Sequence, residues 1–382
     1  MKTKRHILIF IDWYLPGYKA GGPIQSCANL VNHLKPFYNF SIVTRNTDFG
    51  ETKPYLNVKS DEWVEIEEGI RLYYISADKL NPSAIKSFLT SDYDALYLNS
   101  LFSIHFTLLP LWYNKAIKKV IVAPRGMLGK GALAIKPFKK KLFLIISRLS
   151  GLYSKVTWHA STPLEADEIK TVFGEQAKIV SALNLPPVKT LTYFKRTKQE
   201  GSMKLFFLSR ISLKKNLLAV FGFLKQVDRK INISFDIIGP VEDESYWKQC
   251  QREIDLLKNS NPNLKTDYLG PIENDELQKR LSSYHAMILP TFNENFGHAI
   301  ADALASGCPV IISDQTPWKN LAERKVGWDI SLDDNGKFVN AIETIASMNE
   351  EAFNELSLNA FNEALRFYND KDIVAQNVKI FG

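Results

Sequence analysis

Two acidic residues in the second half of the chain have a spacing that suits one extended, negatively charged ligand. Glu294 precedes Phe296 and Gly297, where a helix is predicted to begin. The first backbone N–H groups of a helix lack partners inside the helix, so they attract an anion such as a diphosphate. Asp302 follows eight residues after Glu294, which places it about 12 Å further along the same face at 1.5 Å per residue. The pair therefore predicts a site that binds both ends of an elongated ligand.

Two basic residues follow a predicted strand in the same half of the chain. Arg210 and Lys215 come after the apolar run 204–209, at the carboxyl end of that strand. Open α/β sheets bind ligands at this edge. Fixed cations there stabilise an anion that gains charge as it departs. Lys214 is a competing cation beside Lys215, and we assign the role to Lys215.

Glycines at strand ends mark places where a ligand can come close to the backbone. Gly21 and Gly22 lie between the first predicted strand and a helix that starts at Pro23, a residue suited to the first helical turn. Gly239 follows the predicted strand 233–238. We interpret the three glycines as candidate donor-binding positions, because a glycine lacks the Cβ that would block a nucleotide or sugar phosphate.

Three polar residues of the first half are candidates for contact with a ligand. Asn99 follows the predicted strand 95–99, and His105 lies six residues later. Arg125 follows the predicted strand 120–124, where it either faces a ligand or caps the strand. His105 is equally well explained as a packing residue on the side of a helix.

The elements that position these residues alternate along the whole chain. Short apolar runs rich in β-branched residues, such as 7–11, 204–209 and 310–313, recur between amphipathic stretches, which predicts doubly wound α/β layers. A chain of 382 residues fits two such domains. Pro186 and Pro187 introduce a polar, basic stretch that marks a boundary. We predict a first domain over 1–188, a linker over 189–202, a second domain over 203–364 and a terminal helix over 365–382.

The motifs together resemble the retaining glycosyltransferases of family 4. The acids 294 and 302 match the E-x7-E signature of that family, with Asp302 in place of the usual Glu, and Arg210 with Lys215 resembles its R-x4-K pattern. Pro124, Arg125, Gly126 and Met127 resemble an element of a subgroup that builds bacterial surface polysaccharide. Many relatives carry a His that touches the sugar where this chain has Asn99. The resemblance therefore implies that Asn99, His105 and Arg125 lie on the acceptor or sugar side of the site.

The resemblance implies a GT-B fold, with two facing Rossmann-like domains and a terminal helix that crosses back to the first. It implies transfer of a sugar from a nucleotide to a hydroxyl of a glycan or lipid-linked acceptor, with no metal and no cofactor. In relatives Glu294 would meet the donor sugar, Asp302 the ribose, and Arg210 with Lys215 the diphosphate. The alternatives are a nucleotide-sugar 2-epimerase of the same fold and a non-catalytic subunit that binds glycan or lipid.

Charge is distributed unevenly between the two halves. Residues 1–190 hold 25 Lys and Arg against 15 Asp and Glu, and residues 95–164 hold 11 Lys and Arg and no acid. The cluster Lys136, Lys139, Lys140 and Lys141 precedes an apolar run. This pattern is either a solvated basic face or a surface for an anionic membrane. No motif for nucleic acid accompanies it, so we expect none as a partner.

We expect a cytoplasmic protein, peripheral on the inner face of the cell membrane. No apolar run is long enough to span a bilayer, and the apolar run after the basic amino end is too short for a signal peptide. Cys27, Cys250 and Cys308 are isolated, which suits a reducing compartment and predicts neither a disulfide framework nor a metal cluster.

Overall fold

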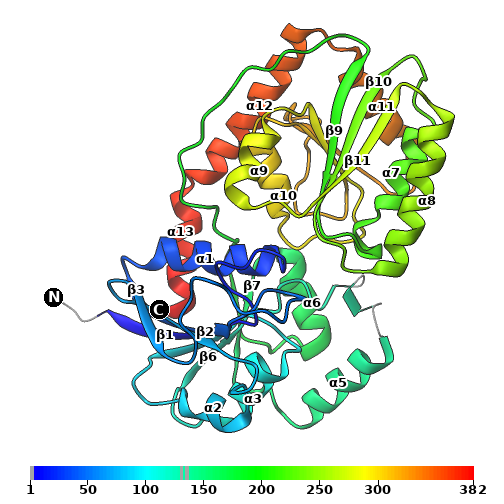
Figure 1. The fold of residues 1–382 in the computed structure, drawn as a ribbon. Helices are drawn as coiled ribbons and strands as arrows, with labels where there is room; N and C mark the ends of the chain where they lie inside the picture. Colours follow the sequence, from blue (N-terminus) through cyan, green and yellow to red (C-terminus); the bar gives the residue numbers. More distant parts are fainter. Residues whose placement is uncertain (1–3, 130–131, 134–136) are drawn as a thin grey trace. The chain divides into compact units, whose positions relative to one another are not determined.

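The computed structural model describes residues 4–129, 132–133 and 137–382, and the chain divides into two compact units. The first unit comprises Met1–Val188 and Asp370–Gly382, and the second comprises Lys189–Asn369. Each unit is a largely parallel sheet covered by helices (Figure 1). The predicted α/β class with two Rossmann-like domains is therefore confirmed.

The first unit is built on a sheet of eight strands in the order β3-β4-β2-β1-β5-β6-β7-β8. All neighbours pair in parallel except β3 with β4. Its strands are β1 (Arg5–Phe10), β2 (Tyr38–Arg45), β3 (Trp63–Glu67), β4 (Ile70–Ile75), β5 (Ala95–Leu98), β6 (Lys119–Val122), β7 (Thr157–Ala160) and β8 (Ile179–Ser181). Its helices are α1 (Gly22–Leu34), α2 (Pro82–Ser87), the π-helical turn η1 (Ile104–Leu108), α3 (Leu109–Tyr113), α5 (Pro137–Leu149), α6 (Pro163–Phe173) and α13 (Lys371–Phe381).

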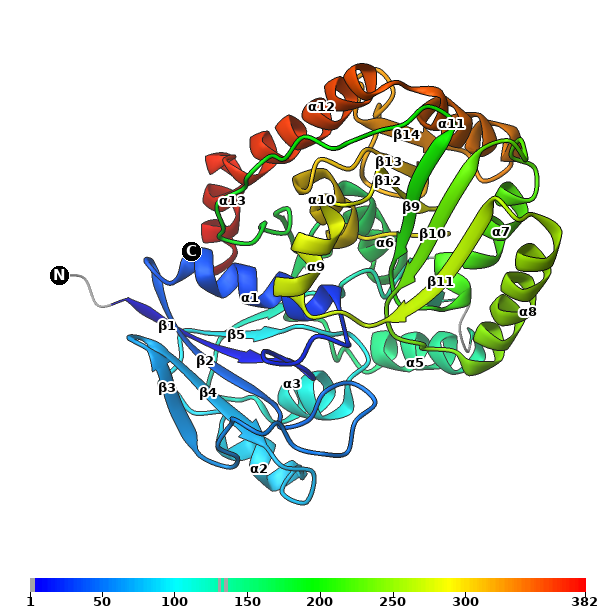
Figure 2. The same cartoon turned by 45° about the horizontal axis from the view of Figure 1, so that its top comes forward.

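The second unit is a six-stranded parallel sheet in the order β11-β10-β9-β12-β13-β14. Its strands are β9 (Ser202–Leu208), β10 (Asn232–Ile238), β11 (Leu264–Gly270), β12 (Ala286–Leu289), β13 (Val310–Ser313) and β14 (Gly327–Ile330). Its helices are the 3-10 turn η2 (Leu213–Lys215), α7 (Leu217–Leu224), α8 (Glu244–Ser260), α9 (Asn274–Leu281), α10 (His298–Ala305), α11 (Asn335–Ser347) and α12 (Glu350–Tyr368). Helices α7, α8 and α11 pack together on one face, and α10 packs with α12 on the other (Figure 2).

The central strands are buried because their sequences are continuous apolar runs. Phe10, Leu98, Phe206 and Ile311 are fully buried, as expected of strands covered by helices on both faces. In parallel sheets the loops at the carboxyl ends of the strands gather at one edge. The loops after β9 and β12 are thereby brought to the same edge of the second sheet.

The end of the chain returns to the first unit through helix α13. Asn377 donates a hydrogen bond from Nδ2 to the carbonyl of Leu183 at 2.8 Å, and the Tyr38 hydroxyl donates to the carbonyl of Val378 at 2.9 Å. The Phe381 ring packs against Tyr38 and lies 6.3 Å from the ring of Phe40. Helix α12, by contrast, belongs to the second unit, and the division falls between residues 369 and 370.

Residues 189–202, expected to form a linker, lie within the second unit. Arg196 is buried there, and its partners among the described residues are uncharged groups. Its guanidinium donates to the carbonyls of Ser282 (2.8 Å), Gly307 (3.1 Å) and Ser306, and to the Ser357 hydroxyl (2.7 Å). One side chain thus joins the end of α9, the turn before β13 and helix α12. The polar, basic composition of the segment reflects this buried role as well as solvent exposure.

We expect Arg196→Met to lower the free energy of unfolding of the second unit by about 3 kcal/mol. Methionine fills similar volume, but it leaves several buried acceptors unpaired, each of which costs about 1–3 kcal/mol. The measurement is urea unfolding followed by fluorescence. Lys195→Met is the matched control, because Lys195 is exposed and such changes cost about 0.5 kcal/mol or less. Equal stability of the two variants would contradict the role given to Arg196.

Candidate functional site

The candidate site of the second unit centres on an ion pair between Lys215 and Glu294. Lys215 ends the 3-10 turn η2 after β9, and it is 8 % exposed. Asn216 then adopts the left-handed conformation, with φ 58° and ψ 40°. Asparagine is one of the few residues other than glycine that adopts this conformation readily. This turn carries Lys215 inward, and its Nζ donates a hydrogen bond to Glu294 Oε2.

Backbone contacts tie the loop that carries Glu294 to the loop that carries Lys215. The N–H of Phe292 donates to the carbonyl of Lys214 at 2.9 Å, and the Thr291 hydroxyl donates to the same carbonyl at 3.2 Å. The N–H of Glu294 donates to the carbonyl of Gln315 at 2.9 Å. The loops after β9, β12 and β13 therefore hold the ion pair in a fixed place.

Opposing effects act on the pKa of Glu294. Burial raises it, but the charges of Lys215 and Lys214 and the hydrogen bond from Lys215 lower it by more, with a smaller contribution from His298. The net pKa is below the ordinary value of a glutamate, so the carboxylate stays ionised at neutral pH. The arrangement provides a fixed negative charge next to a buried ammonium group.

Glu294 lies against the start of helix α10, as predicted. Gly297 is the residue before the helix and has φ 83°. A Cβ at this position would lie 2.8 Å from Ile300 Cδ1 and 3.3 Å from Glu294 Cγ, so both space and conformation favour glycine. Phe296 is buried, and its carbonyl accepts a hydrogen bond from the Trp318 indole at 2.7 Å. These contacts fix the amino end of α10 beside the carboxylate.

Asp302 lies on α10 with partners of its own. Its Oδ1 is 3.6 Å from Lys189 Nζ, and both side chains are about 30 % exposed. Burial raises the pKa of Asp302 above its ordinary value, and Lys189 opposes this only in part. Burial and the charge of Asp302 also raise the pKa of the Tyr368 phenol. Asp302 therefore lies on α10, the helix that begins beside Glu294, but its ion pair with Lys189 is separate from the pair of Lys215 and Glu294.

Arg210 is close to the site in sequence but is paired elsewhere. Its Nη1 is 2.8 Å from Glu242 Oε1, and both side chains are one-third exposed. Gly239 is set directly against the backbone before Arg210, because a Cβ there would lie 2.0 Å from the Ser209 carbonyl. The structure thus brings Lys215 to Glu294 and leaves Arg210 at the edge of the loop.

Helix α1 begins at Gly22, so only Gly21 of the glycine pair precedes it. Gly21 has φ 70° and ψ −128°, and its carbonyl accepts the N–H of Ile24 at 3.1 Å. Nothing lies within 4 Å of a Cβ built on Gly21, so its conformation rather than crowding favours glycine. Gly22 is the first residue of the helix and Pro23 follows it.

Arg125 and Asn99 are brought together in a network within the first unit. Arg125 Nε donates to Asn99 Oδ1 at 2.7 Å, Nη2 donates to the Tyr97 hydroxyl at 2.7 Å, and Nη1 donates to Asn184 Oδ1. The Tyr97 hydroxyl is in turn 2.8 Å from His159 Nδ1. Burial and the Arg125 charge lower the pKa of His159 to about 3. Arg125 therefore links residues at the ends of several strands. These contacts explain the position of its side chain, and no ligand is needed to explain it.

His105 does not join Asn99 and Arg125. It lies in the π-helical turn η1, where burial and the charge of Arg45 lower its pKa and Asp12 opposes them. The three residues predicted for the acceptor side thus divide between two places in the first unit.

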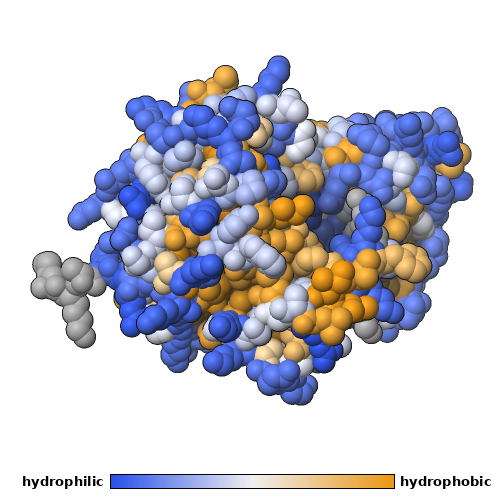
Figure 3. All heavy atoms as spheres, turned by 90° about the horizontal axis from the view of Figure 1, so that it is seen from below, coloured by the Kyte–Doolittle hydropathy of each residue, from blue (hydrophilic) through white to orange (hydrophobic). Residues whose placement is uncertain are grey.

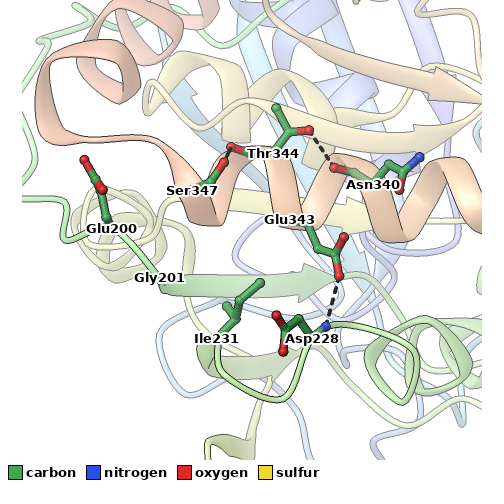
Figure 4. Close-up of a pocket in the computed structure, with 8 residues that line it drawn as sticks. All are labelled: Glu200, Gly201, Asp228, Ile231, Asn340, Glu343, Thr344 and Ser347. Atoms are coloured by element: carbon green, nitrogen blue, oxygen red, sulfur yellow. Dashed lines mark hydrogen bonds between the residues drawn. The ribbon is translucent and has the colours of Figure 1, made fainter.

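The second unit also has a hollow of about 680 Å³, which none of its candidate site residues lines (Figure 4). It is lined by Glu200, Gly201, Asp228, Ile231, Asn340, Glu343, Thr344 and Ser347. The lining residues adjoin the amino ends of β9 and β10, whereas Arg210 and Gly239 follow their carboxyl ends. Ligands of open α/β sheets bind at the carboxyl edge. The acidic hollow therefore carries no part of the candidate site.

Three partners of the candidate residues were not predicted from the sequence. Lys189 is distant from Asp302 along the chain, and Glu242 follows β10 whereas Arg210 follows β9. No local pattern in the sequence therefore indicates either partner. His298 directly follows Gly297, and its place at the start of the helix is a signal that could have been used. Among the described residues, no group of three or more His, Cys, Asp or Glu is placed to hold a metal ion.

Comparison with known proteins agrees with this geometry. Residues 188–362, which include Arg210, Lys215, Glu294 and Asp302, match the family model described as glycosyl transferases group 1. No curated protein sequence matches the chain significantly.

Solved structures resemble the chain over almost its full length. The sucrose-phosphate synthase of Thermosynechococcus elongatus has a TM-score of 0.70 and 15 % identity, covering 99 % of this chain and 98 % of that one. HepE of Anabaena, solved with UDP and glucose, has a TM-score of 0.69 and 12 % identity, covering 98 % of each chain. A variant of S. aureus TarM, solved with Fondaparinux, alpha-GlcNAc-glycerol and UDP, has a TM-score of 0.69 and 12 % identity, covering 99 % of each chain. Residues 188–362 are therefore similar to the glycosyl transferases of group 1, and the whole chain has the GT-B fold of these solved structures.

Proposed function

We propose that the protein is a retaining glycosyltransferase that moves a sugar from a nucleotide-sugar to a hydroxyl group of a glycan or lipid-linked acceptor. The observation that carries the proposal is the ion pair of Lys215 and Glu294 at the carboxyl edge of the second sheet, whose side chains are 10 % and 17 % exposed. The group 1 family match over this unit and the UDP complexes of HepE and TarM support a nucleotide-sugar donor. The resemblance to surface-polysaccharide enzymes supports a growing glycan as the acceptor.

The proposed reaction breaks the bond between the sugar C1 and the diphosphate oxygen and forms a bond between C1 and the acceptor oxygen. The acceptor proton leaves with the diphosphate. Lys215 and Arg210 neutralise the departing diphosphate, and Arg210 exchanges Glu242 for the ligand. Glu294 binds the donor sugar, and Asp302 binds the ribose hydroxyls in place of the usual glutamate. Gly21 and Gly22 let a ligand approach the backbone of the first unit. Gly239 and Gly297 instead let the loops of the second unit pack closely, because the protein itself fills the space that a Cβ would take.

The chemistry requires no cofactor, and we propose that it requires no metal ion. Fixed ammonium and guanidinium groups stabilise a departing diphosphate in the way that Mg²⁺ does in other transferases. Nucleic acid has no place in this reaction, and we propose none as a partner.

Product analysis separates this function from its two rivals. Incubation with UDP-, GDP- and ADP-sugars and a set of acceptor glycosides should yield a glycoside whose anomeric NMR coupling matches that of the donor sugar. A nucleotide-sugar 2-epimerase would convert the donor without any acceptor. A non-catalytic subunit would bind nucleotide or glycan and release no nucleotide. Either result, or an inverted anomeric centre, would contradict the proposal.

Helix α5 supports a position at the cytoplasmic face of a membrane. In the described part of the chain, no helix is both long and apolar enough to cross a bilayer. Phe138, Leu142, Ile145 and Leu149 recur at helical spacing on α5 and are 48–89 % exposed. At 100° per residue they form one outward stripe, together with Ile146. Figure 3, which views the side where α3 and α5 lie in Figure 1, shows apolar side chains on this face.

Cations flank the apolar stripe on both sides. Lys139 follows the first residue of the stripe on one side, and Lys141 and Arg148 lie on the other, all three exposed. Lys140 points elsewhere, because its Nζ donates to the Ala132 carbonyl at 2.6 Å. Lys136, also expected in this cluster, lies outside the described residues. An apolar stripe with flanking cations fits an interface of anionic lipid headgroups, which we propose as the occupant.

The triple variant Lys139→Glu, Lys141→Glu, Arg148→Glu is expected to lose binding to anionic vesicles. Each cation near such a surface contributes about 1 kcal/mol, so binding should fall by about two orders of magnitude or more at low salt. Cosedimentation with vesicles of phosphatidylglycerol and phosphatidylcholine measures the change.

The matched control is Lys248→Glu, Lys258→Glu, Lys265→Glu, which changes the net charge equally on exposed residues of the second unit. Equal losses in both variants would mean that total charge rather than α5 determines binding. If the wild-type protein does not bind the vesicles, the proposed membrane association is wrong.

A further inference from the structure

A second set of polar and aromatic residues lies at the carboxyl edge of the first sheet. Asp12 and Trp13 follow β1, Arg45 ends β2, and Ser103 and His105 follow β5. The chain runs from β1 to β2 on one side, and β5 lies on the other side of β1. This reversal of strand order is the place where open α/β sheets form ligand sites.

Asp12 is held through only one of its two carboxylate oxygens. Its Oδ1 accepts a hydrogen bond from the Ser103 hydroxyl at 2.8 Å and is 3.6 Å from Arg45 Nη2. Within the described residues, Oδ2 receives no hydrogen bond. The side chain is 16 % exposed, so it is fixed in orientation without being sealed off. Such an oxygen is available to accept a hydrogen bond from a ligand hydroxyl.

Aromatic rings fix the guanidinium of Arg45 and leave part of Trp13 exposed. The Arg45 guanidinium carbon is 5.2 Å from the centre of the Phe106 ring and 5.9 Å from that of Trp13. Trp13 is braced by an edge contact with Phe49 at 5.0 Å between ring centres, and it is half-buried. Arg45 Nε is buried and has no hydrogen-bond partner in the structure.

This combination matches the surface of a sugar ring. The C–H face of a pyranose is apolar and packs on an indole ring, whereas its hydroxyls lie around the rim. Two neighbouring hydroxyls fit a carboxylate that accepts one hydrogen bond and a guanidinium that donates another. The adjacent carboxylate and guanidinium nearly cancel in charge, which favours an uncharged sugar over an anionic one.

We propose that Asp12, Trp13 and Arg45 bind an uncharged sugar ring of the acceptor through two adjacent hydroxyls. Asp12 Oδ2 accepts a hydrogen bond from one hydroxyl, Arg45 donates to its neighbour, and Trp13 packs against the ring. His105 lies at the rim of this site. The assignment rests on the proposed function in one respect, since it takes the acceptor to be a glycan.

Saturation-transfer NMR tests the site on the full-length protein without any need for turnover. The probes are the methyl α- and β-glycosides of glucose, galactose, mannose and N-acetylglucosamine. We expect the wild-type protein to bind at least one of them, and Asp12→Asn and Trp13→Ala each to weaken that binding about tenfold or more. Asp12→Asn preserves the size of the side chain, so its fold can be checked by thermal unfolding.

Asp61→Asn is the matched control in the same unit. Asp61 also accepts a hydrogen bond from a serine hydroxyl, that of Ser76 at 2.8 Å, and lies 3.4 Å from Lys79 Nζ. It should bind glycoside like the wild type. The proposal fails if the wild type binds none of the glycosides, or if folded Asp12→Asn and Trp13→Ala bind as well as the control. A wild type that binds glycoside but consumes no nucleotide-sugar would instead overturn the proposed function.

Discussion

Glu294→Ala is expected to lower sugar transfer by about a thousandfold while the chain stays folded. The residue lies in a loop at the carboxyl edge of the second sheet, and its carboxylate is ionised and fixed by Lys215. Loss of one fixed group that acts on the reacting centre costs about 10²- to 10³-fold in other enzymes. The measurement is the initial rate of nucleotide release with the preferred donor and acceptor.

A surface ion pair of the same unit supplies the control for this variant. Glu253 pairs with Lys225 at 2.5 Å, and both side chains are at least 30 % exposed. Glu253→Ala should retain activity. A folded Glu294→Ala protein with the turnover of the wild type would show that the catalytic assignment is wrong.

Lys215→Met is expected to weaken nucleotide binding by about ten- to a hundredfold. One charge-assisted hydrogen bond to a diphosphate is worth about 1.5–3 kcal/mol, and methionine replaces the stem of the lysine but not its charge. The variant also leaves Glu294 without its nearest cation, so its pKa should rise. Arg210→Ala should weaken binding less, because Arg210 must first leave Glu242.

Titration calorimetry with UDP, GDP and ADP measures this effect. The double variant Lys215→Met, Glu294→Gln removes both charges. It should be more stable than Lys215→Met, but it should bind nucleotide no more tightly. Lys225→Met is the exposed control. Unchanged affinity in Lys215→Met, together with loss of wild-type activity on addition of a chelator, would contradict the proposal that cations replace a metal.

The fold was predictable because the sequences of the buried strands are continuous apolar runs. The runs at 7–11, 204–209 and 310–313 all became strands of the two sheets. Strand β3 was missed because it is an edge strand with exposed Glu65 and Glu67, so it has no apolar run. Strand β14 was missed because only its first and last residues are buried.

The local geometry of the site was partly predictable. The helix start at Gly297 follows from a glycine at a turn, and Asn216 takes the conformation that glycine would otherwise supply. Lys215 was preferred to Lys214 only through the resemblance to the R-x4-K pattern, because the choice depends on which side chain the 3-10 turn directs inward. The structure places Lys215 on Glu294.

Contacts between distant residues were beyond a single sequence. Lys189 reaches Asp302, and Asp12 meets Ser103, only because strands and helices far apart in the chain lie together in the fold. No periodicity or motif in the sequence predicts such contacts. The same holds for Arg125, whose hydrogen bonds to Asn99 and Tyr97 depend on the order of the strands in the sheet.

The most direct measurement is nucleotide release from UDP-, GDP- and ADP-sugars in the presence of EDTA, with and without a glycoside acceptor. The proposed metal-free transfer predicts nucleotide release from one class of donor, which acceptor stimulates, EDTA does not diminish and Glu294→Ala abolishes. Absence of release from every donor, or release that requires added Mg²⁺ and persists in Glu294→Ala and Lys215→Met, would contradict it.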